Sequence, residues 1–287
     1  LVGKAAAKSP DRARRLLEAA FYASNFQAKH FPSRKLTTAR AFISPVCMDA
    51  VLHPLAHPER SAIVNLFLPC EILHAMRIEP QIAEGLSCYF SGAGSEQYFI
   101  EYARQKGVPD TLCSYHKILT GIALSGVLPK PRLIANTTLA CDANTNTFRR
   151  IAAHYGVPHF TVDTPCADDA DAVQYVADQL RELARFTEEA MHERFSEDAL
   201  RAVLACEQRS MQACRSYYDL LADRYLPNEM TSEMYTLFAT HILLGKPEIE
   251  QYFEQLCEDA KNAPVFQGGN RILWVHSLPY GQSALRT

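Results

Sequence analysis

The sequence predicts an α/β fold in which a Rossmann-like parallel sheet has helical segments before and after it. Between residues 61 and 168, short apolar runs alternate with helical patterns of about ten to fifteen residues, which favours a parallel sheet with helices on both faces. The apolar runs are followed by proline, glycine or polar turns, as strands usually are. From residue 169 onward the pattern is helical.

Residues 1–60 are expected to form an N-terminal helical segment. Apolar residues recur at helical spacing from residue 11 to residue 28, which indicates one amphipathic helix. The stretch after that helix is expected to be a loop because it contains several prolines, namely Pro32, Pro45, Pro54 and Pro58. We therefore expect this segment to be accessory to the sheet.

Residues 61–168 are expected to form the Rossmann-like domain. Apolar runs predict its strands, at residues 63–68, 86–90, 133–136 and 159–162. Helical spacing and end signals such as Ser95 and Gly156 predict the helices between them, at residues 71–76, 95–105, 113–124 and 144–155. A sheet of this kind binds ligands beyond the carboxyl ends of its strands.

Residues 169–265 are expected to form a second helical segment. Its helices are predicted at residues 170–195, 197–225, 231–244 and 247–262. Cys206 and Cys214 fall near one face of a helix, and core packing is their expected role because free cysteine behaves as a small hydrophobe. The apolar run at residues 271–276 predicts a further strand. We therefore expect residues 266–287 to open a second α/β domain that the sequence does not complete.

Composition excludes several classes of protein. The net charge of −3 offers no concentrated basic face for nucleic acid. No apolar run approaches the roughly 20 residues of a membrane span, and no signal peptide is evident, so we expect a cytoplasmic protein. Nine scattered cysteines without CxxC or HExxH argue against a disulfide framework or a standard zinc site. Metal, cluster or plain burial are the better explanations for these cysteines.

Three segments are expected to meet at the carboxyl edge of the sheet, because each follows a predicted strand: residues 69–71, 138–141 and 163–166. Within them, Glu71 is either a polar site residue or an acidic residue favoured at a helix N-terminus by the helix dipole. Asp163 is equally consistent with a structural and a catalytic carboxylate.

Several local patterns then line up along the chain. Pro69-Cys70-Glu71-Ile72 follows the first strand, Cys113-Ser114-Tyr115 begins a helix, and Cys141 follows the next strand. Two further segments, at residues 157–165 and 271–276, complete the order. From about residue 60 to the C-terminus this order resembles the D-component of the 2-hydroxyacyl-CoA dehydratase family. That family includes the benzoyl-CoA reductases and the double-cubane cluster proteins.

The resemblance implies two Rossmann-like domains per subunit and a 4Fe-4S cluster held by three cysteines. Cys113 and Cys141 match two of these positions, and the third is expected beyond Thr287. Thiolates are the ligands that such clusters need, and a helix start lowers the pKa of a thiol. Three protein ligands leave one iron able to act as a Lewis acid. The competing interpretation is that both cysteines are buried and structural.

Other residues are weaker candidates. Cys70 and Cys166 could serve as ligands if the cluster is a double cubane, and Cys88 has less support. Ser114 and Tyr115 could donate hydrogen bonds to cluster sulfide or to a substrate thioester, although Ser114 could equally be a helix cap. The two histidines in these motifs are His116, which is more often a packed or surface residue than a base, and His276, whose role is open.

The resemblance implies an enzyme subunit, a hydro-lyase that removes water from a 2-hydroxyacyl-CoA. A single low-potential electron would reduce the thioester carbonyl to a ketyl radical anion. The α-hydroxyl would then leave, the β-proton would be lost, and the electron would be recycled. The chain has no Walker A motif, so ATP would act only through a separate iron–sulfur activator, and a paralogous second subunit is expected. A benzoyl-CoA reductase-like or double-cubane electron-transfer subunit, and a scaffold without a cluster, are the alternatives.

Overall fold

The computed structural model describes residues 2–226 and 230–269 of the chain. A four-stranded parallel sheet lies at its centre, in the order β2-β1-β3-β4. The strands are β1 (Ser61–Val64), β2 (Glu79–Ile82), β3 (Leu133–Thr137) and β4 (His159–Val162). The α/β fold with a parallel sheet is thereby confirmed. From β1 the chain continues to β2 at one edge of the sheet, and from β3 it continues to β4 at the other edge. The topological switch point therefore lies between β1 and β3.

Two sequence predictions about the sheet are wrong. The strand expected at residues 86–90 is part of helix α5 (Ala83–Gly92), and the second strand is instead β2. Residues Leu86 to Phe90 are buried without interruption, and periodicity cannot separate a buried helix from a buried strand. Strand β2 escaped notice because it contains Pro80, which is tolerated here because β2 is an edge strand.

The loop expected between residues 31 and 60 is also wrong over most of its length. Helix α3 (Thr38–Ala56) runs through Pro45 and Pro54, and a 3-10 turn, η1 (Pro58–Arg60), follows it. A proline inside a helix removes one backbone hydrogen bond. Burial of the helix offsets this cost, since Ile43, Val51 and Leu52 are almost fully buried. Helix α3 packs against β1 and β2.

The remaining helices near the sheet agree with the sequence predictions to within a few residues. They are α2 (Pro10–His30), α4 (Glu71–Ala75), α6 (Glu96–Gln105), α7 (Ser114–Leu124) and α8 (Ala143–Tyr155). A short helix that was not predicted, α1 (Val2–Ala6), precedes them. Helices α6 and α7 touch backbone to backbone. A Cβ atom on Gly121 would overlap the carbonyl oxygen of Phe99, so only glycine fits at this contact.

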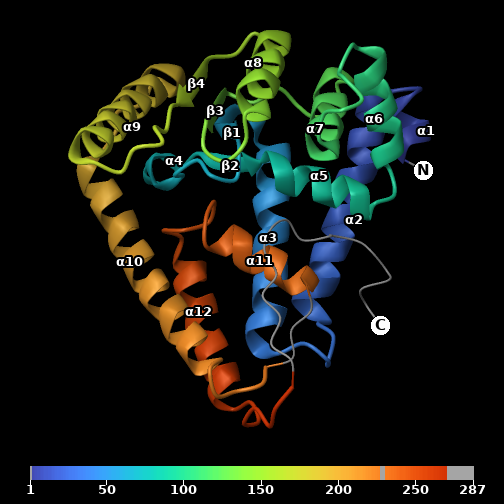
Figure 1. Cartoon of the computed structure of the whole chain (residues 1–287). Helices are drawn as coiled ribbons and strands as arrows, with labels where there is room; N and C mark the ends of the chain where they lie inside the picture. The colour runs from blue at the N-terminus through green and yellow to red at the C-terminus, as the bar shows by residue number, and fades with distance from the viewer. Residues whose placement is uncertain (1, 227–229, 270–287) are drawn as a thin grey trace.

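A helical layer lies below the sheet in Figure 1. It contains α10 (Glu197–Leu220), α11 (Met230–Ala239) and α12 (Pro247–Lys261), and α9 (Ala170–Met191) joins it to the sheet by packing on β4. Helix α10 packs along α12, and α12 packs against α3, whose long axis connects the two layers (Figure 1). One continuous cluster of buried apolar residues extends from Val2 to Ala260.

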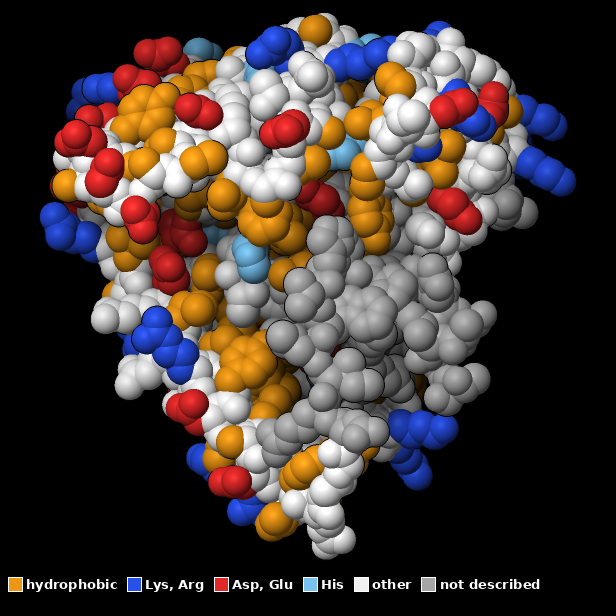
Figure 2. Space-filling view, in the orientation of Figure 1, with side chains coloured by type: hydrophobic (Ala, Val, Ile, Leu, Met, Phe, Trp, Pro, Cys, Tyr) orange, Lys and Arg blue, Asp and Glu red, His pale blue; other side chains and the backbone are white. Residues whose placement is uncertain are grey.

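The surface carries mixed charge. Figure 2 shows lysine and arginine side chains scattered among aspartates and glutamates on the displayed face, and no large basic patch. Among the described helices, none is both long and apolar enough to cross a bilayer. The strand expected at residues 271–276 and His276 lie outside the described residues.

Candidate functional site

The carboxyl edge of the sheet is held together by hydrogen bonds at the switch point. The amide of Asn65, just after β1, donates from Nδ2 to Oγ1 of Thr137 over 3.2 Å. Its Oδ1 accepts the backbone N–H of Thr137 over 3.0 Å. Both side chains are buried, so the two central strands are tied together at the point where such a sheet opens a ligand crevice.

The ends of β3 and β4 are linked in the same way. Thr138 Oγ1 donates to Oδ1 of Asp163 over 2.9 Å and accepts the N–H of Thr164 over 2.9 Å. The hydroxyl of Tyr175 in α9 donates to the other carboxylate oxygen of Asp163 over 3.2 Å. Both oxygens of Asp163 therefore accept hydrogen bonds that hold the loop after β4 against its neighbours.

Helix α7 begins beside this edge. Cys113 is its N-cap residue and is exposed, and Ser114, the first helical residue, is exposed as well. Tyr115 is half-buried; its carbonyl oxygen accepts the hydroxyl of Ser87 over 3.0 Å, and burial raises the pKa of its phenol. Cys113 thus presents an exposed thiol at a helix start.

One contact between predicted site residues is made through His116. Its Nε2 lies 3.4 Å from Sγ of Cys141, which is half-buried in the loop between β3 and α8. Burial lowers the pKa of His116, so its imidazole is neutral at neutral pH. Because His116 belongs to the first turn of α7, this contact sets that turn against the Cys141 loop. Cys113 and Cys141 consequently lie on adjoining segments.

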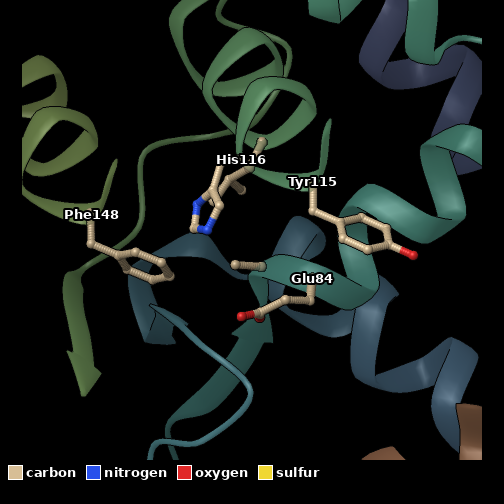
Figure 3. A pocket seen from close by; sticks show the side chains of 6 residues that line it. Glu84, Tyr115, His116 and Phe148 are labelled. Carbon is tan, nitrogen blue, oxygen red and sulfur yellow. The ribbon is translucent and has the colours of Figure 1, made fainter. Parts of the chain in front are cut away.

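A small cavity lies behind His116. It has a volume of about 10 Å³, close to the space of one water molecule, and its lining includes Glu84, His116 and Phe148 (Figure 3). The Oε2 atom of Glu84, in the first turn of α5, accepts the N–H of Leu66 over 3.0 Å. Burial raises the pKa of Glu84 to about 7, so this carboxyl can hold a proton near neutral pH.

Glu71 lies in a different hollow. Together with residues such as Ile72, Leu180 and Arg201, it lines a groove of about 550 Å³ between α4, α9 and α10. Burial raises the pKa of Glu71 to about 7, and the negative charge of Glu207 adds to the shift. Neither the two matched cysteines nor Ser114 lines this groove, so the structure does not bring all the predicted site residues into one pocket.

The other candidate cysteines differ in exposure. Cys70 is fully buried, its thiol donates to the carbonyl oxygen of Leu68 over 3.3 Å, and burial raises its pKa. Cys88 is buried, and burial raises its pKa to about 12. Cys166, after β4, is exposed. Cys206 and Cys214 are both buried in α10, in keeping with the packing role expected for them.

The described residues fit part of an iron–sulfur site. Among them, no group of three or more His, Cys, Asp or Glu side chains is arranged to hold a metal ion. The exposed thiol of Cys113 and the half-buried thiol of Cys141 have the chemistry of cluster ligands and lie on adjoining segments. They can supply two thiolates of a three-thiolate set.

Sequence reasoning missed three residues of this edge and gave His116 little weight. Asn65 lay inside a predicted strand, and Thr137 drew no attention as a residue at a strand end. Glu84 lay next to the strand wrongly predicted at residues 86–90. The available signal was a polar side chain directly after an apolar run, at positions where a parallel sheet binds ligands.

Comparison with known proteins bears on the identity of the chain. A family model described as 2-hydroxyglutaryl-CoA dehydratase, D-component, matches residues 65–286, a stretch that includes Cys113 and Cys141. No curated protein matches the chain significantly. The match covers well over half of the 287 residues and confirms the resemblance found in the sequence. The chain belongs to the family of the 2-hydroxyglutaryl-CoA dehydratase D-component.

Proposed function

We propose that this chain is one subunit of a cytoplasmic, iron–sulfur 2-hydroxyacyl-CoA dehydratase. The observation that carries the proposal is the placement of Cys113 and Cys141 on adjoining segments beside the carboxyl edge of the sheet, within the stretch that matches the family. The reaction class is the elimination of water from a 2-hydroxyacyl-CoA thioester after one-electron activation.

Cys113 and Cys141 would hold a 4Fe-4S cluster through their thiolates. The cluster, when bound, would supply an iron that takes a substrate oxygen as a Lewis acid. A third thiolate would come from outside the described residues. The electron would be delivered by a separate ATP-hydrolysing iron–sulfur activator, and a paralogous subunit would complete the enzyme.

The surrounding residues would keep the edge rigid. The Asn65–Thr137 pair joins the ends of the two central strands, β1 and β3, and the Thr138–Asp163 pair joins the loops that follow β3 and β4. Preorganised polar groups of this kind need no rearrangement during a reaction. Ser114 is exposed beside Cys113, so its hydroxyl is free to donate to a substrate oxygen.

Glu71 is proposed as an acid–base residue. Its carboxyl has a pKa near 7, which suits proton transfer at neutral pH. The groove around it, about 550 Å³, is within the range that binds small molecules.

A single cluster fits the described cysteines better than a double cubane. A double cubane would call on further thiolates, for which Cys70, Cys166 and, with less support, Cys88 are the candidates. Cys166 is exposed and could serve, whereas Cys70 and Cys88 differ from it. Both of these residues are buried, and burial raises the pKa of both thiols, which disfavours the thiolate form. This burial is the reason for preferring a dehydratase subunit over a double-cubane reductase.

Turnover of the complete enzyme tests the proposal. The chain would be co-expressed with its paralogous subunit, purified without oxygen, and given the activator, ATP and a panel of 2-hydroxyacyl-CoA esters. We expect the unsaturated acyl-CoA to form only when ATP and the activator are both present. An iron-containing complex that dehydrates none of these esters but reduces an aromatic acyl-CoA would overturn the proposal in favour of a benzoyl-CoA reductase-like subunit.

A further inference from the structure

The two candidate ligand cysteines have different surroundings. The thiol of Cys141 is half-buried and lies 3.4 Å from Nε2 of His116. The thiol of Cys113 is exposed, and in the described part of the chain no side chain forms a hydrogen bond with it. Two ligands on adjoining segments therefore offer unequal environments to whatever they bind.

His116 is held in place to make this contact. The residue is buried, with only 8% of its surface exposed. Figure 3 shows its ring extending from α7 toward the small cavity, whereas the ring of Tyr115 points away from it. A neutral imidazole has one N–H donor, and a thiolate accepts hydrogen bonds but cannot donate. When Cys141 is a thiolate, the proton of His116 must therefore lie on Nε2 if the contact is to be favourable.

The backbone before Cys141 is also constrained. Ala140 has a φ angle of 66°, in the left-handed region that residues with a Cβ rarely adopt. Such a conformation is strained and persists only where the surroundings enforce it. The carbonyl oxygen of Cys141 accepts the N–H of Asn144 over 3.1 Å, which fixes the loop from its other side. The strain lies directly before the cysteine that His116 contacts.

We propose that His116 is a positioning residue that donates an Nε2–H hydrogen bond to the thiolate of Cys141. It would orient this thiolate and make Cys141 the more firmly held of the two ligands. This inference rests on the proposed iron–sulfur function. It adds a residue that stands outside the cysteine pattern and is identified by the geometry of α7 and the strained loop.

The hydrogen bond has two measurable consequences. Hydrogen bonds to cluster sulfurs help to set the reduction potential, and removal of a donor is expected to lower it because the more negative reduced state loses stabilisation. Loss of a partner that orients a ligand also typically weakens metal binding by about 10- to 100-fold. Both effects can be measured without turnover.

The test compares His116→Leu and His116→Phe, which lack a donor, with His116→Gln, whose side-chain amide retains one. His159→Leu is the matched control, because His159 is also a partly buried histidine but bonds Asn136 over 2.8 Å and no cysteine. Each variant is made in the co-expressed complex without oxygen. The readouts are the midpoint potential followed by EPR and the rate of iron loss to a chelator.

We expect either folded donor-free variant to lose iron about 10- to 100-fold faster than the unaltered protein, with a lower midpoint potential. His116→Gln should recover most of both properties, and His159→Leu should change neither. If the donor-free variants match the unaltered, iron-containing protein in both readouts, the role of His116 is overturned while the cluster proposal stands. An unaltered complex without iron would instead overturn the proposed function itself.

Discussion

Three cysteines near the sheet edge have environments opposite to those of the helical layer, whereas Cys70, which also follows a strand, is buried. Cys113 and Cys166 are exposed and Cys141 is half-buried, and all three occupy loops or helix starts near the carboxyl ends of strands. The cysteines of α10 and α12 are all buried on helix faces, namely Cys206, Cys214 and Cys257. The same side chain is available for chemistry in one region and serves as core in the other.

Electrostatics reinforces this difference. Burial raises the pKa of Cys214 to about 11, and it also raises the pKa of Cys206 and Cys257. A thiol of this kind stays protonated at neutral pH and is a poor ligand and nucleophile. Exposure of a cysteine at the carboxyl edge of the sheet, rather than the number of cysteines, therefore indicates where a cluster can be held.

The largest expected effect comes from removing a ligand at the sheet edge. Cys113→Ala and Cys141→Ala should each abolish the cluster, because either change leaves too few thiolates to hold it. Iron and sulfide analysis after anaerobic purification measures this loss. Cys206→Ala is the matched control and should retain iron. Full iron content in both edge variants would show that Cys113 and Cys141 are not ligands, so they would not differ in function from the buried cysteines of the helical layer.

The next effect belongs to the helical layer. Phe253 in α12 is fully buried, and Phe253→Ala should destabilise the protein by about 3–5 kcal/mol through lost burial and the cavity left behind. Denaturant unfolding of the variant measures this change. The folded fraction should keep its iron, since the substitution touches no ligand. A variant as stable as the original would show that this layer does not support the fold as described.

Glu84 gives the sheet edge a pH dependence of its own. Its carboxyl has a folded-state pKa of about 7, above the unfolded value of 4.5, so its contribution to stability is complete below pH 4.5 and is lost as the pH rises toward 7. The loss should amount to about 2–3 kcal/mol. Denaturant unfolding measured from pH 4.5 to 7.5 should therefore show a shallower decline in Glu84→Gln than in the unaltered protein.

Glu71 provides the comparison for that measurement. Its pKa is also about 7, yet it lies in the groove beside the helical layer. Glu71→Gln should flatten the same pH range, and the double variant should flatten it more than either single change. If Glu84→Gln leaves the decline unaltered, Glu84 is not buried as the structure has it.

The smallest expected effect is that of Cys206→Ala. Cys206 is buried in α10, so its loss should cost on the order of 1 kcal/mol in packing, as point substitutions usually do. The free energy of unfolding from denaturant titration measures it. A decrease of several kcal/mol in the free energy of unfolding, or a loss of iron, would mean that Cys206 has a role beyond core packing.

Helices and strands were predicted well where residues next to them in the sequence mark their ends, and poorly where burial against distant residues decides their form. Strand β4 and helix α6 were predicted closely because clear turn residues bound them. Helix α3 was missed because its prolines suggested a loop, and only burial against the sheet makes them tolerable. Helix α5 was mistaken for a strand because tertiary burial on all sides hides the helical period.

The sequence could name a candidate site residue where that residue belongs to a recognisable motif. Cys113 and Cys141 could be singled out because they match cysteine positions of the family that the sequence resembles; their assignment as ligands stays a prediction. The contact of His116 with Cys141 joins segments 25 residues apart and depends on how α7 packs, which no local pattern reports. The separation of Glu71 from the cysteines likewise depends on where α9 and α10 cross α4.

The most direct test of the account is the iron and sulfide content of the unaltered chain. It would be co-expressed with its paralogous subunit, purified without oxygen and examined by EPR before and after reduction. The account predicts about four irons per cluster-bearing subunit and a signal that appears on reduction. No iron and no signal under these conditions would contradict it, and would mean that Cys113 and Cys141 are structural residues of a scaffold.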